Sequence, residues 1–367
     1  MNEIIRFAII GSGWRAKYYI RIAQKIPERF EVAAVVCRRP EKAEHIMHEF
    51  GVPAVLSPQE CMDRNPDFVV VAVDKPHIAE VAAEWLGYGF AVLAETPAAM
   101  DRETLEELKE LERHHAKLVF AEQYRFVPEN AAVLKLLDAG LIGTPHSLYL
   151  SLAHEYHAVS LMRAFLQRSI RSSFTVRAKE WVFPTAETLS RYERFTDGRM
   201  ADKKRMAALF EFADGTFCLY DFDSEQYRSP IRGSHMRLTG SRGEICGNTV
   251  RWLDENNTPH CEILKTETRI VKTNDPNPNF ESIEEAVSVS LGQKILYEPE
   301  YGLCGLSRDD AAIAHMLGMM NDYARGRGNP PYPLRDAIAD AYAAILLREA
   351  AAEGVLKEAD MLSYFDY

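Results

Sequence analysis

The stretch "IIRFAIIGSGWRAKYYIRIAQKIP", residues 4–27, decides the fold of the first part of this chain. Its β-branched opening predicts a buried strand over residues 4–10, and apolar residues at helical spacing from Ala16 onward predict a helix. Between them, Gly11 and Gly13 permit a tight turn. Such a turn offers a pyrophosphate the free N–H groups and the positive dipole end of the helix. The pattern therefore predicts a strand, a phosphate-binding turn and a helix.

The complete turn reads G-x-G-x-x-A, and Ala16 takes the place of a third glycine as a permitted small residue. With a second strand following the helix, this order predicts dinucleotide binding, and a bare structural turn is the alternative. We expect the cofactor contacts to lie in the turn and after the neighbouring strands. The expected contact residues are Gly11, Ser12, Gly13, Trp14, Arg15, Cys37, Arg38, Arg39, Val73, Asp74, His77, Glu95, Thr96 and Gln123.

The end of the second predicted strand, "EVAAVVCRRPEKA" (31–43), indicates which dinucleotide binds. An acidic residue there would accept hydrogen bonds from the adenosine ribose and repel a 2′-phosphate. The chain instead has Cys37, Arg38 and Arg39. Two guanidinium groups can pair with a phosphate or stack on the adenine. We therefore favour NADP over NAD as the cofactor; the alternative is that both arginines are solvated loop residues.

Short β-branched runs alternate with helical periodicity through residues 1–125. Strands that are apolar on both faces and separated by helices indicate a parallel sheet covered on each side. Residues 126–367 read differently, because strand-like runs follow one another and Asp214-Gly215 predicts a hairpin. We therefore expect an α/β chain with a doubly wound Rossmann domain over 1–125. An α+β domain with a large open, antiparallel or mixed sheet follows over 126–367.

Composition excludes several classes of partner. The 367 residues carry 43 Lys plus Arg against 54 Asp plus Glu, a net charge of −11, which offers nothing to nucleic acid or an anionic membrane. No segment reaches about 18 apolar residues, and the N-terminus does not resemble a signal peptide. The six cysteines form no C-x-x-C pair, so we expect neither a zinc site nor a disulfide framework. A reducing cytoplasm is the expected compartment.

Five stretches together resemble the Gfo/Idh/MocA family, the glucose-fructose oxidoreductase and inositol dehydrogenase group. They are "GSGWRA" (11–16), "PDFVVVAVDKPH" (66–77), "GYGFAVLAETP" (87–97), "LIGTPHSLYL" (141–150) and "YPLRDAIADAYAAILLREAAAEG" (332–354). The resemblance covers nearly the whole chain. It implies a Rossmann domain followed by an α/β domain whose open sheet commonly serves in oligomerisation, and hence a homo-oligomer, either a dimer or a tetramer.

The resemblance also implies a catalytic lysine that this chain lacks. In the family, a Glu-Lys-Pro motif places the lysine beside the nicotinamide and the substrate hydroxyl, where its charge helps the hydroxyl to lose a proton. Here Thr96 takes its place. A threonine hydroxyl can form a hydrogen bond, but it carries no positive charge to stabilise a developing alkoxide.

A second family signature, Asp-x-Gly-x-His-x-x-Asp, corresponds to "AHEYHAVS" at 153–160. His157 matches the histidine, whereas Ala153 and Ser160 stand at the two aspartates. An imidazole titrates in the range that suits a general base on a substrate hydroxyl. The alternative for His157 is a structural histidine bonded to backbone at a helix start.

Polar side chains near this signature are candidate substrate contacts. We expect contacts from Tyr124, Arg125, His154, Glu155 and Arg163. Arg228 and Arg232, in "SEQYRSPIRGSH" (224–235), are candidates for holding an anionic group. His154 and His157 lie three residues apart, but no third ligand stands out, so we expect no metal.

These expectations converge on an NADP-dependent oxidoreductase that acts on a secondary alcohol or ketone of a sugar, cyclitol or related polyol. His157 would be the acid/base, with Thr96 and Tyr156 as hydrogen-bonding partners of a small-molecule substrate. Two alternatives stay open. The first alternative is a non-redox member that binds or senses a ligand. The second is an enzyme that oxidises its substrate transiently during glycoside cleavage.

Overall fold

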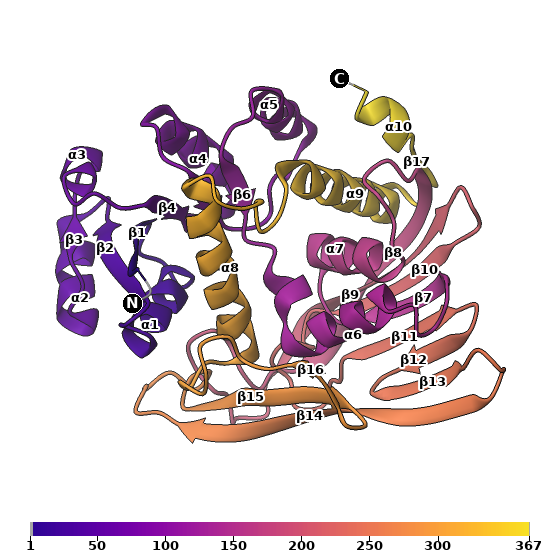
Figure 1. Cartoon of the computed structure of the whole chain (residues 1–367). Coiled ribbons are helices and arrows are strands. Elements are labelled where there is room, and N and C mark those ends of the chain that lie inside the picture. Colours follow the sequence, from indigo (N-terminus) through magenta and orange to yellow (C-terminus); the bar gives the residue numbers. More distant parts are fainter. Residues whose placement is uncertain (1–2, 367) are drawn as a thin grey trace. The chain divides into compact units, whose positions relative to one another are not determined.

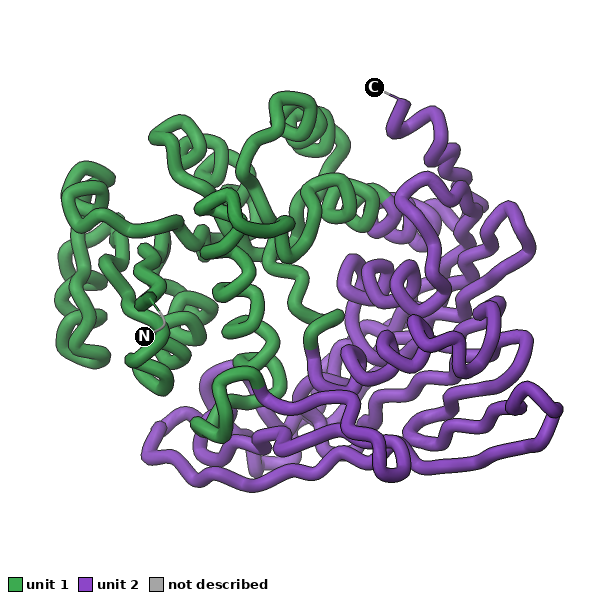
Figure 2. The backbone as a smooth tube through the Cα atoms, viewed as in Figure 1, with its two compact units in different colours: residues 1–126, 300–342 green, residues 127–299, 343–367 purple. Residues whose placement is uncertain are grey.

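The computed structural model describes residues 3–366 and divides into two compact units (Figure 2). The first unit is Met1–Phe126 with Glu300–Tyr342, and the second is Val127–Pro299 with Ala343–Tyr367. The expected boundary after residue 125 therefore lies one residue from the observed one. Residues 300–342, expected in the second domain, belong instead to the first unit. The reason is packing, since helix α8 (Arg308–Ala324) contacts α1 (Ala16–Lys25), β4 (Phe68–Val71) and the short helix η2 (Gln123–Phe126).

The first unit contains the predicted parallel sheet (Figure 1). Its strand order is β3-β2-β1-β4-β5-β6, and all its neighbouring strands pair in parallel. The order reverses between β1 and β4, which is the switch point where such sheets bind ligands at their carboxyl edge. The strands not yet bounded are β1 (Ile5–Ile10), β2 (Phe30–Val36), β3 (Ala54–Val55), β5 (Val92–Ala94) and β6 (Leu118–Phe120).

Local signals in the sequence start and stop the helices of this unit. Ser57 and Asp101 cap α3 (Pro58–Met62) and α5 (Arg102–Arg113) by accepting the backbone N–H of the third residue of each helix. Proline at its first position opens α2 (Pro40–Phe50), and Gly51 ends it in the left-handed conformation. The other helical segments are η1 (Lys75–His77) and α4 (Ile78–Gly87).

The second unit contains an 11-stranded mixed sheet of order β16-β15-β14-β13-β12-β11-β7-β10-β9-β8-β17. Only β7 and β10 pair in parallel, and the other neighbours are antiparallel. The strands are β7 (Pro145–Ser151), β8 (Phe174–Ala186), β9 (Met200–Phe212), β10 (Phe217–Asp223), β11 (His235–Gly240), β12 (Gly243–Cys246), β13 (Thr249–Leu253), β14 (Pro259–Lys272), β15 (Ser282–Leu291), β16 (Lys294–Tyr297) and β17 (Lys357–Ala359).

Two helices cover one face of this sheet (Figure 1). Helix α6 (Pro128–Asp138) packs on β15 and β16, and α7 (Glu155–Phe165) packs on β7 and on α6. Alternate residues such as Leu148 and Leu150 are buried beneath them, whereas Tyr149 is partly exposed on the other face. The chain also forms α9 (Leu334–Glu353) and α10 (Met361–Tyr364). The alternation leaves the second face of the sheet without a helical cover among the described elements.

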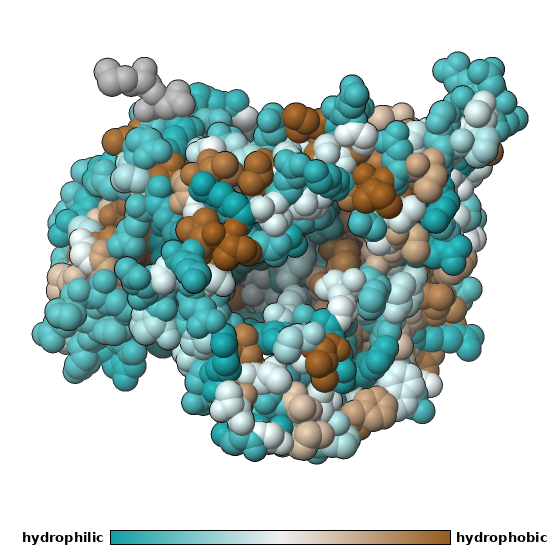
Figure 3. All heavy atoms as spheres, turned by 90° about the horizontal axis from the view of Figure 1, so that it is seen from below, coloured by the Kyte–Doolittle hydropathy of each residue, from teal (hydrophilic) through white to brown (hydrophobic). Residues whose placement is uncertain are grey.

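The described surface is mixed rather than uniformly polar. On the face that Figure 3 views, apolar residues form small groups between polar ones. Among residues 3–366, no helix has both the length and the apolar character needed to cross a membrane.

Candidate functional site

The turn after β1 has the geometry of a phosphate cradle. Gly11 adopts φ 113°, and a Cβ added there would lie 2.4 Å from the carbonyl oxygen of Ala72. Its N–H donates to the carbonyl of Val36 at 3.0 Å. Gly13 is exposed, and an added Cβ would meet no described atom within 4 Å. The first glycine is thus required by the fold, whereas the second leaves open space where a pyrophosphate can approach the backbone.

The carboxyl end of β2 presents the residues expected to select the dinucleotide. Cys37 is buried, which raises the pKa of its thiol, and it hydrogen-bonds with Ser12 of the glycine turn. Arg38 and Arg39 are exposed before α2. Within the described chain, neither guanidinium has an ion pair or a side-chain hydrogen bond. Both are therefore available to an anionic ligand.

The residues expected after β4 lie beside the sheet's switch point. Val73 is half-buried, and Asp74 is exposed just before η1. His77 is also exposed, and its Nδ1 lies 3.5 Å from a carboxylate oxygen of Glu80. Trp14, in the glycine turn, packs edge-on against Tyr18 with ring centroids 5.7 Å apart.

Glu95 lies at the centre of a partly buried polar network. Tyr19 Oη and Arg15 Nε both donate to Glu95 Oε1, at 2.5 and 2.8 Å. Arg15 Nη1 donates to Asp309 Oδ2 at 2.9 Å, and Gln123 Nε2 donates to Asp309 Oδ1 at 2.8 Å. The network joins the glycine turn, the ends of β5 and β6, and the first turn of α8. We refer to these five residues, Arg15, Tyr19, Glu95, Gln123 and Asp309, as the edge network.

Burial shapes the electrostatics of this region. Although burial opposes the charged form of Arg15, the carboxylates of Glu95 and Asp309 raise its pKa. Burial and the charge of Glu95 raise the pKa of Tyr19, which keeps its hydroxyl protonated as a donor. Burial also raises the pKa of Glu122 to about 8, so this carboxyl holds a proton around neutral pH.

Thr96 follows Glu95 and is half-buried at the end of β5. Its hydroxyl stands where the resemblance implies an ammonium group. Arg15 does not replace that charge, because its guanidinium is already paired with Glu95 and Asp309. At Thr96 itself the chain therefore offers a hydroxyl for hydrogen bonding and no positive charge.

Two expected substrate contacts, Tyr124 and Arg125, belong to η2 in the first unit. The N–H of Tyr124 donates to Glu122 Oε1 at 3.3 Å. The guanidinium of Arg125 lies 4.9 Å from the ring centroid of Tyr332 and 3.9 Å from Asp336. These contacts anchor Arg125 against the closing segment 300–342.

In the second unit, the start of α7 gathers an aromatic group around His157. This histidine is 5% exposed, and its ring centroid lies 4.2 Å from that of Tyr156 and 5.0 Å from that of His154. Tyr227 Oη accepts the N–H of His154 at 3.0 Å and lies 2.8 Å from its Nδ1. No third metal-ligating side chain joins these histidines in the part of the chain that the structure describes.

Glu155 stands where the resemblance implies a glycine, and its φ of 36° falls in the left-handed region. Such a conformation strains a residue with a side chain and persists only where surrounding contacts hold it. Its N–H donates to Tyr220 Oη at 3.1 Å, and its carboxylate pairs with Arg348 at 2.6 Å. Glu155 is thus held by contacts within its own unit.

The positions of the two missing aspartates are fully enclosed. Ala153 and Ser160 are both 0% exposed, and the expected substrate contact Arg163 is also buried. The helix therefore offers no carboxylate at either position for a substrate or a cation. Of the four residues that the signature specifies, His157 is the one that this chain keeps.

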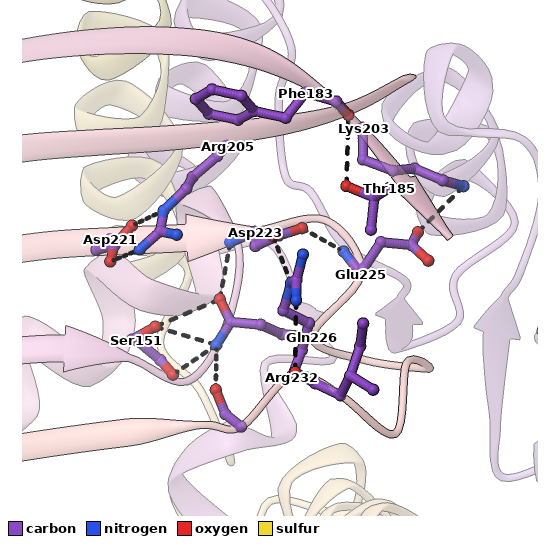
Figure 4. Close-up of polar contacts among 12 residues, drawn as sticks. Ser151, Phe183, Thr185, Lys203, Arg205, Asp221, Asp223, Glu225, Gln226 and Arg232 are labelled. Atoms are coloured by element: carbon purple, nitrogen blue, oxygen red, sulfur yellow. Dashed lines mark hydrogen bonds and ion pairs between the residues drawn. The ribbon is translucent and has the colours of Figure 1, made fainter. Parts of the chain in front are cut away.

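The loop after β10 is tied to the end of β7 (Figure 4). The Gln226 amide donates to the Ser151 carbonyl and to the Gly233 carbonyl, at 3.1 and 3.0 Å. Arg232 Nε donates to Asp223 Oδ2 at 3.0 Å. Arg232 is therefore already paired with a carboxylate of its own unit, and the expectation that it holds an anionic substrate group stays a prediction.

The structure brings the expected residues together in two groups, one in each unit. The first unit joins Arg15, Glu95 and Gln123, and the second joins His154, Tyr156 and His157. Sequence patterns missed Asp309 and Tyr227. Asp309 lies 294 positions from Arg15, so no local pattern links them. Tyr227 lies in the segment 224–235 with Arg228 and Arg232, but its partner His154 is 73 residues away.

Part of the chain matches a known protein family. Residues 5–123 match the oxidoreductase family with an NAD-binding Rossmann fold. Dehydrogenase aclE of Aspergillus oryzae is 28% identical over 155 residues, which are 39% of this chain and 42% of that protein. The segments matched in the curated relatives are less than half of their length.

Solved structures share the fold along nearly the whole chain. An oxidoreductase from Agrobacterium radiobacter, in complex with NAD+, L-tartaric acid and magnesium, has a TM-score of 0.66 at 15% identity, covering 99% of this chain and 100% of its own. A scyllo-inositol dehydrogenase from Lactobacillus casei has a TM-score of 0.61 at 16% identity, covering 97% and 98%. At these identities the likeness concerns the fold alone.

Proposed function

We propose that this chain, whose residues 5–123 match the Gfo/Idh/MocA family of oxidoreductases, transfers hydride between NADP and a sugar, cyclitol or related polyol. The observation that carries the proposal is the turn at Gly11 and Gly13, where the first glycine is fixed by close packing and the second is open. A ligand that approaches the backbone closely would account for that second glycine.

The choice of NADP rests on Arg38 and Arg39. Both are exposed and available at the end of β2, where an acidic residue would favour NAD. The family description names NAD, and the similar Agrobacterium structure holds NAD+. A direct comparison of NADPH and NADH affinities decides between the two cofactors.

When bound, the nicotinamide supplies the hydride donor or acceptor. In the direction of oxidation, His157 takes the proton of the substrate hydroxyl, and in reduction it returns that proton. Tyr156 packs on His157 and limits the orientations of its ring. Thr96 contributes a hydrogen bond without a charge. Because no lysine ammonium is then present to stabilise the developing alkoxide, we expect slow turnover.

The test is absorbance at 340 nm with NADP+ or NAD+ over a panel of polyols and sugars, and with NADPH or NADH over the corresponding ketones. A change that depends on both substrate and enzyme supports the proposal. His157→Ala should abolish most of that change while leaving cofactor affinity nearly intact. Cofactor binding without turnover on any panel member would contradict it.

A non-redox role is the second candidate, and the residues at the family positions favour it. Thr96 carries no charge, and Ala153 and Ser160 replace both aspartates with buried side chains. A protein that binds or senses a ligand, or that oxidises a glycoside only transiently, needs less of the hydroxyl-activating machinery. Ligand binding without net change in nicotinamide absorbance would favour this role, and release of an aglycone would identify the glycosidase-like variant.

We also propose a homo-oligomer, a dimer or a tetramer, formed through the uncovered face of the large sheet. Trp181, Phe183 and Leu219 are exposed and line an open hollow of about 690 Å³ on that face. Apolar side chains gathered on an open sheet favour burial against a partner. Light scattering after size exclusion should report more than one chain, and Trp181→Glu should shift the mass toward the monomer.

A reducing cytoplasm remains the proposed compartment. All six cysteines are free thiols in the structure, and three of them are buried. Thiols that stay unpaired are compatible with a reducing environment. Localisation of a tagged chain in its native cell would test this.

A further inference from the structure

The amide of Gln123 has only one chemically acceptable orientation. One end of the amide lies 2.8 Å from a carboxylate oxygen of Asp309. A carboxylate oxygen accepts hydrogen bonds, and only the NH₂ end of an amide can donate one. Nε2 must therefore face Asp309, which directs Oε1 the other way.

That carbonyl oxygen is buried and unpaired. Gln123 is 5% exposed, and its Oε1 has no hydrogen-bond partner among the described residues. A buried acceptor without a donor loses its hydration without compensation. The side chain is thus held with an acceptor unused, directly after the last strand of the parallel sheet. A ligand that brings an N–H group to this edge would satisfy it.

Asp309 is itself fixed by its surroundings. Its second oxygen accepts from Arg15 Nη1, and Arg15 is bound in turn to Glu95. Asp309 also lies in the first turn of α8, whose start is fixed by a reciprocal capping box between Ser307 and Asp310. The fixed start of α8 and the ion pair with Arg15 restrict the orientation of the Asp309 carboxylate. Its hydrogen bond with Gln123 is therefore maintained.

We infer that Asp309 is a positioning residue for the cofactor: it holds the Gln123 amide so that Oε1 can accept an N–H of the nicotinamide carboxamide. The inference rests on the proposed function, because it requires a nicotinamide dinucleotide. In a doubly wound sheet the adenosine lies toward the first strands and the nicotinamide toward the strands beyond the switch point. Gln123 follows β6, on that second side. The carboxamide is the part of the nicotinamide that can donate N–H groups.

The test compares ligands with and without the nicotinamide. NADPH and NADH carry the carboxamide, whereas ADP-ribose and its 2′-phosphate lack the whole nicotinamide ring. Affinities are measured by titration calorimetry on the full chain for the wild type, Gln123→Met, Asp309→Ala and the double variant. Asp322→Ala is the matched control, because Asp322 is a half-exposed carboxylate of the same helix whose described side-chain partners, Arg327 and Asn321, lie outside the edge network.

We expect Gln123→Met and Asp309→Ala each to weaken NADPH or NADH binding about tenfold, the change that corresponds to roughly 1.4 kcal/mol. Affinity for the ribose fragments should stay within about twofold, and Asp322→Ala should change nothing. Because Asp309 acts through Gln123, the double variant should bind no more weakly than Gln123→Met alone.

Several results would overturn the inference. Equal losses for the dinucleotides and the ribose fragments would mean that Asp309 maintains the whole cofactor site rather than one amide. Additive losses in the double variant would separate Asp309 from Gln123. If Asp309→Ala fails to fold, Gln123→Met still tests the contact with the carboxamide. Methionine is similar in size to glutamine, and the substitution leaves the ion pairs of Arg15 intact. Should the wild type bind neither NADPH nor NADH, the proposed function itself fails.

Discussion

Substitutions at the two glycines of the first turn should separate folding from cofactor binding. In Gly11→Ala, the new Cβ would sit 2.4 Å from the Ala72 carbonyl oxygen, on a backbone with φ 113°. The conformation costs about 1–3 kcal/mol for a residue with a side chain. Relief of the overlap costs about 1–3 kcal/mol more. We therefore expect a loss of roughly 2–6 kcal/mol, a large share of a typical stability of about 5–15 kcal/mol.

Gly13→Val is the matched partner, since an added Cβ meets no described atom within 4 Å and φ is not in the left-handed region. Its free energy of unfolding should change by no more than about 0.5 kcal/mol, as for other exposed positions. Its branched side chain nevertheless fills the space through which a pyrophosphate reaches the backbone. Cofactor affinity should therefore fall by at least about 100-fold, which is roughly 2.7 kcal/mol.

Urea unfolding followed by circular dichroism measures the first effect, and titration with NADPH followed by tryptophan fluorescence measures the second. Gly11→Ala should lose stability, whereas Gly13→Val should keep stability and lose binding. Full stability in Gly11→Ala would show that the turn has room for a Cβ next to the Ala72 carbonyl oxygen. Unchanged NADPH affinity in Gly13→Val would remove the case for a phosphate cradle.

Three further predictions concern selectivity, chemistry and pH. Arg38→Ala should weaken NADPH more than NADH in parallel titrations, and tighter NADH binding by the wild type would refute NADP selectivity. For any substrate found, His157→Ala should lower kcat by about 10²- to 10⁴-fold with little change in cofactor Kd; an unaffected kcat would make His157 structural. Because burial raises the pKa of Glu122 from 4.5 to about 8, the folded protein binds a proton that the unfolded chain releases. The stabilisation that this proton on Glu122 contributes is present below about pH 4.5 and is lost as pH rises toward 8. Relative to Glu122→Gln, the wild type should lose up to about 1.4 kcal/mol per pH unit in urea unfolding between pH 5 and 8; parallel stabilities would refute the raised pKa.

The parallel half of the fold could be predicted because its signals are local. The apolar strand before Gly11, the cap at Asp101 and the glycine that ends α2 each lie within one element. The long strands β8, β14 and β15 gave no such signal. Most residues of β14 are exposed, so its sequence lacks the apolar alternation that marks a half-buried strand.

The candidate site shows the same difference between local sequence signals and nonlocal packing. The order of strand, glycine turn and helix predicted the turn at Gly11 and Gly13, and the family resemblance pointed to His157, because each motif is contiguous in the chain; the roles of these residues stay predictions. The return of residues 300–342 to the first unit was not, since it depends on packing between segments far apart in sequence. Asp309 reaches Arg15 and Gln123 only through that packing, across 294 and 186 positions. The pairing of Arg232 with Asp223 is local by comparison, because the two residues lie 9 positions apart.

The discontinuity of the first unit has a consequence for biosynthesis. After Phe126 emerges from the ribosome, the whole segment Val127–Pro299 must be translated before α8 becomes available. At about 5–20 residues per second, completion of the unit through Tyr342 takes roughly 10–40 s longer. Until then, the surfaces of α1 and η2 that α8 covers remain bare on the nascent chain. During this interval a chaperone would be most useful to the N-terminal sheet. A chain truncated before residue 300 would lack α8, and these surfaces would stay exposed.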